Sequence, residues 1–197
     1  MLSPRPDPDA YRASLANLHS LLAIRAIALL GQTAVLAYVL AASRTTASPI
    51  GLAASLCVLA AFTLASYWRS YRPWPVTDGE FFGQLLGDVI VWSALMYFSG
   101  GANNPFISYY IVPVVVSAAV LPWRYTWLVT GASLAAYSIL LYVYVPFPLF
   151  SPHAAMGHDG AASVHTLGMW FNFLFSAGLI TYFVVRMGAI LRSQAAR

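Results

Sequence analysis

Six long apolar stretches constrain this chain more than any other feature. They cover approximately residues 21–42, 49–68, 81–99, 106–122, 125–145 and 165–186. A helix of about 20 apolar residues crosses the hydrocarbon core of a bilayer, and none of these stretches alternates as a barrel strand would. The pattern predicts an all-α fold, a polytopic membrane protein with six transmembrane helices. Pro113 lies within the fourth and shortest span, where it could kink the helix.

The composition supports a lipid-exposed chain. Of its 197 residues, 60% are hydrophobic and only 8% are charged, whereas a soluble domain normally carries about a quarter charged residues. The net charge of +4 does not indicate nucleic acid, because the basic residues are all arginines spread along the chain. We therefore expect the lipid bilayer to be the main partner and expect no nucleic acid.

The arginines predict the orientation, since positive charge gathers on the cytoplasmic side of a membrane. Arg44 falls on the opposite side from the other arginines that flank the spans. Both termini should then be cytoplasmic, and the loops at 43–48, 100–105 and 146–164 should face outward. Under a six-span count, eight arginines share the cytoplasmic side: Arg5, Arg12, Arg69, Arg72, Arg124, Arg186, Arg192 and Arg197.

Asp88 is the only acidic residue inside a predicted span. A carboxylate at that depth costs several kcal/mol, on the order of 3 or more, unless it is paired or faces the bundle interior. Gln84 lies one turn before it, Arg25 is a candidate partner from the first span, and Asn172 is another from the sixth. The group is either a helix-packing network or a proton- or ligand-coupled switch element.

Gly79, Gly83 and Gly87 recur every four residues in the third span. Such spacing places small residues on one face of a helix and predicts a ridge on which a neighbouring helix packs closely. Cys57 lies in an apolar run and reads as a small buried residue, and a single cysteine excludes an internal disulfide.

Candidate enzyme and metal motifs are weak. His153, His158 and His165 lie in or beside the last outward loop, but their spacings match no helical metal motif, so we expect no metal. Ser133, in a Gly-x-Ser sequence, is separated in depth from His165 by roughly 15 Å at 1.5 Å per residue. The two cannot form a nucleophile–base pair without a broken helix. We expect no catalytic residues on this chain.

The segment SGGANNPF, residues 99–106, joins the third and fourth spans. Gly100 and Gly101 suit the positive φ of a helix C-cap, Asn104 suits an N-cap and Pro105 suits the first helical position. A capped turn therefore explains most of the segment. Aromatic residues also gather at this level: Trp92, Tyr97, Phe98, Phe106, Tyr109 and Tyr110.

The alternative reading is a shallow apolar pocket. Asn103, Asn104 and the first N–H groups of the fourth span would supply hydrogen-bond donors. A lipid-soluble ring with carbonyl acceptors, such as a quinone, would suit a pocket of this kind.

Residues 100–106 read GGxxNPF and resemble the heptapeptide of the RegB/PrrB/ActS (RoxS-like) redox-sensing histidine kinases. The similarity extends to QLLGDVIVWSALMYF before the loop and to IRAIALLGQ at 24–32, LPWRYTW at 121–127 and the segment 165–187. The resemblance implies a six-helix sensor domain in a bacterial inner membrane that senses ubiquinone. The quinone-binding residues implied by the resemblance are Gly100, Gly101, Asn104, Pro105 and Phe106, with Asn103 added because it lies between them. The aromatic pocket reading adds Tyr109 and Tyr110 as candidate quinone-binding residues.

In that family the sensor domain precedes a cytoplasmic kinase, functions as a homodimer and signals to a response regulator. We find no phosphoaccepting histidine motif in this chain, so the kinase is expected to be absent. The expected organisation is a cytoplasmic segment at 1–20, the sensor domain at 21–186 and the start of a cytoplasmic linker helix at 187–197. Two alternatives remain open: a small six-helix transporter and a structural membrane subunit.

Overall fold

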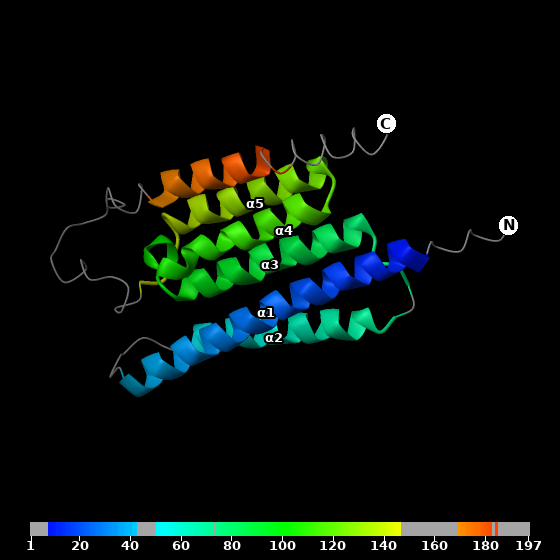
Figure 1. Cartoon of the computed structure of the whole chain (residues 1–197). Coiled ribbons are helices and arrows are strands. Elements are labelled where there is room, and N and C mark those ends of the chain that lie inside the picture. The colour runs from blue at the N-terminus through cyan, green and yellow to red at the C-terminus, as the bar shows by residue number, and fades with distance from the viewer. Residues whose placement is uncertain (1–7, 43–49, 73, 147–168, 183, 185–197) are drawn as a thin grey trace.

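The structure is a computed structural model that describes residues 8–42, 50–72, 74–146, 169–182 and 184. Within these residues the regular structure is entirely helical, which confirms the predicted all-α class. Residues 169–182 are also helical. The other elements, shown in Figure 1, are α1 (Pro8–Ala42), α2 (Ile50–Ser70), α3 (Asp78–Phe98), η1 (Gly101–Asn103), η2 (Pro105–Tyr110), α4 (Ile111–Val120) and α5 (Trp123–Leu140).

Three described helices are long and apolar enough to cross a membrane, and they are Ser14–Tyr38 within α1, Ile50–Ser70 and Asp78–Phe98. A shorter apolar helical segment covers Pro105–Val120. These helices identify the chain as a membrane protein by length and composition. Helix α1 begins at Pro8 and therefore extends through much of the segment 1–20 that we expected to precede the first span.

Successive helices run in alternating directions (Figure 1). Helix α2 contacts both α1 and α3, and α5 contacts both α3 and α4. The α1–α2 hairpin forms one edge of the bundle and the helix over 169–182 forms the other (Figure 1). The α2–α3 and α4–α5 connections lie at one end, and residues 99–104 lie at the opposite end (Figure 1).

Two apolar clusters hold the helices together. The cluster near residues 99–104 includes Trp92, Met96, Tyr110, Tyr137 and Phe173. The cluster toward the other end is formed by other buried side chains, among them Leu18, Phe81, Leu85, Leu121 and Val129. Large apolar side chains also cover the outside, including Ile27, Leu30, Leu64, Ile90 and Phe175. A surface of this kind is suited to lipid and not to water.

The fourth apolar stretch changes helix type along its length. It begins as the 3-10 helix η2 and becomes α-helical at Ile111. Pro113 consequently lies in the first turn of α4, where the missing N–H removes no intrahelical α bond. The tighter 3-10 segment, and not a proline kink within an α-helix, accommodates Pro113.

Candidate functional site

A buried ion pair joins α1 to α3. Arg25 is only 2% exposed and Asp88 is 13% exposed. Arg25 Nε lies 2.6 Å from Asp88 Oδ1, and Arg25 Nη2 donates a hydrogen bond of 3.0 Å to Asp88 Oδ2. The Nε–Oδ1 approach is a charge contact that is not aligned as a hydrogen bond. The predicted pairing of Arg25 with Asp88 is therefore present.

Helix α2 completes the surroundings of Arg25. Nη1 donates to Ser66 Oγ at 2.8 Å and Nη2 donates to the Gln84 carbonyl at 2.9 Å. Ser66 Oγ also lies 2.7 Å from Gln84 Oε1, and the Phe62 ring lies 4.4 Å from the Arg25 guanidinium carbon. One cation thus connects α1, α2 and α3.

This arrangement satisfies the main electrostatic requirement of a charge in a membrane. The positive and negative groups neutralise each other, and the remaining donors of Arg25 have polar or aromatic partners. Asn172, the other candidate partner, is exposed on the helix over 169–182 and is not among the residues that Arg25 hydrogen-bonds. We refer to Arg25, Phe62, Ser66, Gln84 and Asp88 as the Arg25 network.

The Arg25 network depends on a close approach of α2 to α3 at Gly87. A Cβ built on Gly87 would lie 2.4 Å from Phe62 Cζ. The predicted ridge of three glycines is wrong for the other two, because Gly79 and Gly83 have nothing within 4 Å of such a Cβ. Only the last of the three glycines lies where the two helices touch.

The matched glycines Gly87 and Gly83 allow a direct test. Gly87→Ala should destabilise the bundle by about 1–3 kcal/mol, because the new methyl group displaces the Phe62 ring from Arg25. Gly83→Ala should be neutral or should stabilise by about 0.5–1 kcal/mol through helix propensity. Reversible unfolding in mixed micelles measures both changes, and equal effects at the two sites would contradict the close approach.

At the end of α3, two glycines turn the chain into η1. Gly100 has φ 102° and Gly101 has φ 61°, as expected for a helix C-cap. A Cβ on Gly101 would lie 2.6 Å from Tyr144 and 2.8 Å from the Leu140 carbonyl. The segment after α5 is also bonded to this end of α3, since Val145 N donates to the Tyr97 carbonyl at 2.8 Å. The loop is therefore packed against the end of α5.

Asn104 acts as a structural cap and is only 2% exposed. Its Oδ1 accepts a hydrogen bond of 2.9 Å from the Phe106 N–H. Its Nδ2 donates to the Ser99 carbonyl at 3.0 Å and to Ser99 Oγ at 2.8 Å. The predicted N-cap is confirmed, but the Asn104 donors are used within the protein.

The start of the fourth apolar stretch does not offer the free N–H groups that the pocket reading required. Pro105 has no N–H, the Phe106 N–H is capped by Asn104, and the Ile107 N–H donates to the Asn104 carbonyl at 3.0 Å. Asn103 Nδ2 donates to the Tyr144 hydroxyl at 3.2 Å. For the backbone of residues 99–107, these contacts favour the capped turn over the ligand-binding pocket.

The aromatic residues near the loop divide into core and surface. Tyr110 is fully buried, and its hydroxyl lies 2.6 Å from Ser93 Oγ. Tyr109 is half-buried and stacks on Trp92 with ring centroids 4.0 Å apart. Phe106 is exposed, and so is Pro105. Of the predicted ligand-binding residues, two are exposed (Pro105, Phe106), two are half-buried (Asn103, Tyr109) and four are buried (Gly100, Gly101, Asn104, Tyr110).

Sequence reasoning did not assign a separate role to Trp92, which is 4% exposed. Its Nε1 has no hydrogen-bond partner among the described residues. The Tyr137 hydroxyl and Ser133 Oγ, both on α5, likewise have no hydrogen-bond partner among the described residues. A buried indole N–H normally finds a partner. The Trp92 N–H is thus a buried donor without a partner among the described residues, and the half-buried Tyr109 ring stacks on the indole.

The predictions for the cysteine and for the histidines have the following outcomes. Cys57 is exposed on α2, so the expectation of a buried cysteine is wrong. His153, His158 and His165 lie outside the described residues, as does most of the loop 146–164. Within the part of the chain that is described, no group of three histidine, cysteine or acidic residues could hold a metal ion.

Comparisons with protein-family models, with curated proteins and with solved structures found no match to this chain. The functional interpretation therefore depends on the sequence motif and on the geometry of the Arg25 network and the loop.

Proposed function

We propose that this chain is the membrane sensor domain of a RegB-type redox histidine kinase and that it binds a quinone beside residues 100–106. The observation that carries the proposal is the GGxxNPF sequence of the loop. The proposed topology has six transmembrane helices with both termini in the cytoplasm of a bacterial inner membrane. The partners would be a second copy of the chain, a cytoplasmic kinase domain and a response regulator.

The accessible aromatic side chains suggest how the ring of a quinone binds. Phe106 is 37% exposed, and the half-buried Tyr109 stacks on Trp92. A flat ring could lie against Phe106 and Tyr109 with its isoprenoid tail in lipid. In this proposal a shift of the stacked Tyr109 ring opens the buried Trp92 N–H to a quinone carbonyl, whereas the Asn104 donors stay bonded to Ser99.

A donor of this kind distinguishes the two redox states. The indole N–H only donates, so it pairs with a carbonyl oxygen of the oxidised quinone. The hydroquinone carries hydroxyl groups that would each also need an acceptor, and Trp92 supplies none. A difference in affinity between the two states is what a ligand needs to shift a conformational equilibrium.

The packing around the loop suggests where such a shift would be transmitted. Tyr110 follows the accessible Tyr109 and packs on Tyr137 and Phe173, with centroids 6.4 Å away in each case. Phe173 belongs to the helix over 169–182, which would lead to the kinase. The Thr130 and Thr181 hydroxyls lie 2.9 Å apart and connect the same helix to α5.

Quinone binding to the purified protein in nanodiscs tests the proposal. Trp92→Phe preserves the stacked ring and removes the N–H, so affinity for oxidised ubiquinone should fall about five- to ten-fold. Phe106→Ala should also weaken binding, through lost ring contact. Trp127→Phe removes an exposed indole from α5 and should have no effect. Unchanged affinity in both Trp92→Phe and Phe106→Ala would contradict a site at this position.

A further inference from the structure

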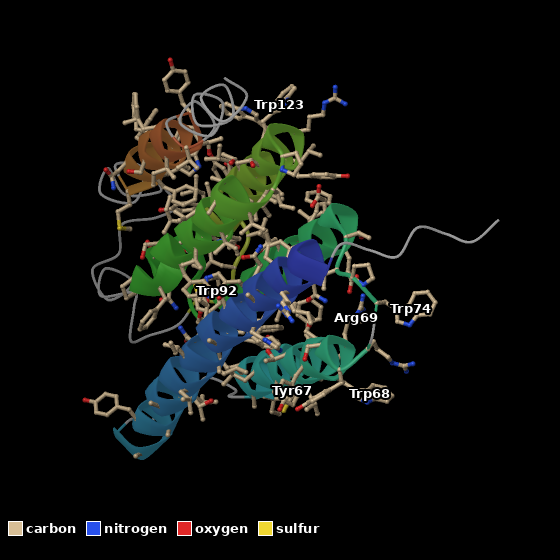
Figure 2. All side chains as sticks on the ribbon, turned by 45° about the vertical axis from the view of Figure 1, so that its right-hand side comes forward. Tyr67, Trp68, Arg69, Trp74, Trp92 and Trp123 are labelled. Atoms are coloured by element: carbon tan, nitrogen blue, oxygen red, sulfur yellow. The ribbon has the colours of Figure 1, made fainter. Side chains whose placement is uncertain are left out.

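Aromatic side chains gather at the end of the bundle opposite the loop, where α2 connects to α3. Tyr67, Trp68, Tyr71 and Trp74 are all exposed, and Trp68 and Trp74 are each 68% exposed. Figure 2 shows Tyr67, Trp68, Arg69 and Trp74 together at this end, well away from Trp92. We call Tyr67, Trp68, Tyr71, Arg72 and Trp74 the aromatic corner.

The aromatic corner is held in place by contacts within the protein. Arg69 forms an ion pair with Glu80 across the connection, with Nε 2.7 Å from Oε1, and its Nη1 lies 3.4 Å from the Trp74 carbonyl. Tyr67 and Tyr71 meet edge to face at 5.1 Å and their hydroxyls are hydrogen-bonded. The α2–α3 connection therefore presents a defined surface.

Arg72 differs from Arg69 in its electrostatic partners. Glu80 neutralises Arg69, whereas the Arg72 guanidinium lies 5.5 Å from the Trp68 ring and has no carboxylate in ion-pair contact within the described ranges. The nearby Asp78 is exposed in the first turn of α3 and forms no ion pair with Arg72. Within the described part of the chain no carboxylate occupies the planar fork of N–H donors of Arg72, a geometry that matches phosphate oxygens.

We propose that the aromatic corner binds an anionic phospholipid, with Arg72 contacting its phosphate. Tryptophan and tyrosine concentrate at the headgroup level of a bilayer, which places Arg72 beside the phosphates. Exposed Leu64 lies one turn before Trp68 on α2 and continues the apolar surface for an acyl chain. Phosphatidylglycerol suits the site better than phosphatidylcholine because its headgroup brings no second cation near Arg72.

Native mass spectrometry of the full chain released from detergent measures this binding. Phosphatidylglycerol should bind more tightly than phosphatidylcholine, and Arg72→Gln should weaken phosphatidylglycerol binding about five-fold. Arg72→Lys should retain part of the affinity, since it keeps the charge but loses the fork. Glycerol phosphate, which carries the headgroup chemistry without acyl chains, should bind at least ten-fold more weakly than the lipid.

Arg124→Gln provides the matched control. Arg124 lies 5.6 Å from the Trp123 ring on the same end of the bundle, and Trp127 is also exposed there. Arg124 therefore presents a similar arginine–tryptophan pair without the Tyr67–Tyr71 pair and the Arg69–Glu80 ion pair of the α2–α3 connection. Its removal should change the affinity less than two-fold. Equal losses in Arg72→Gln and Arg124→Gln would overturn the site in favour of general surface charge. Wild-type affinity in Arg72→Gln, or equal binding of glycerol phosphate and lipid, would also overturn it.

Discussion

Asp88→Ala should destabilise the folded bundle by about 3–5 kcal/mol, because it leaves a buried cation without its counter-ion. Arg25 is 2% exposed and cannot reach water without separating α1 from α2 and α3. Reversible unfolding in mixed micelles, followed by tryptophan fluorescence, measures the free energy of unfolding. Arg25→Ala should have a loss of similar size for the same reason.

Two controls separate the ion pair from ordinary packing. The double variant Arg25→Met/Asp88→Leu removes both charges and should recover most of the stability lost in Asp88→Ala. Glu80→Gln breaks the Arg69–Glu80 pair, in which both side chains are about a quarter exposed, and should cost about 1 kcal/mol or less. If Asp88→Ala cost no more than Glu80→Gln, the buried pair would not stabilise the fold.

The sequence predicted the Arg25–Asp88 pair for a physical reason that holds in any membrane bundle. A charge in hydrocarbon must find a partner, and Arg25 was the available cation at a suitable depth. The contributions of Phe62 and Ser66 were not predictable from the sequence. Serines and phenylalanines are common in apolar spans, and their contact with Arg25 depends on how α2 is rotated about its own axis.

The glycines of α3 show the same difference between local pattern and packing. A four-residue spacing places Gly79, Gly83 and Gly87 on one face, but it does not specify where along that face a neighbour approaches. Only Gly87 meets a side chain of α2. Crossing points are set by tertiary structure, so a pattern within one helix cannot locate them.

Within the candidate site, the backbone conformation of the loop was the feature most predictable from the sequence. The hydrogen-bond partners of its polar side chains were the least predictable. Positive φ at Gly100 and Gly101 and capping by Asn104 follow from intrinsic residue preferences. Whether the Asn104 amide is free for a ligand depends on Ser99, whose carbonyl and Oγ accept the hydrogen bonds that Asn104 Nδ2 donates. Burial of Tyr110 and exposure of Phe106 likewise depend on how η2 is turned toward α3 and α5.

Asn104→Ala should destabilise the protein by about 2–4 kcal/mol, because the side chain is 2% exposed and makes three hydrogen bonds. Its loss would leave the Phe106 N–H and the Ser99 carbonyl without these partners in a buried setting. The same micelle unfolding experiment measures the change. Asn103→Ala serves as the neighbouring control and should cost less, since Asn103 is only half-buried.

Asn104→Asp distinguishes the hydrogen bond that Asn104 accepts from those that it donates. An aspartate can still accept the Phe106 N–H, but it cannot donate to Ser99, and its charge would face the Ser99 carbonyl oxygen. We therefore expect Asn104→Asp to be at least as destabilising as Asn104→Ala at neutral pH.

Quinone affinity measured on the folded fraction then distinguishes a structural from a ligand-binding role of Asn104. Loss of affinity with unchanged stability in Asn104→Ala would show that Asn104 contacts the ligand directly. Loss of stability with retained affinity in the folded fraction is the result that the buried cap predicts.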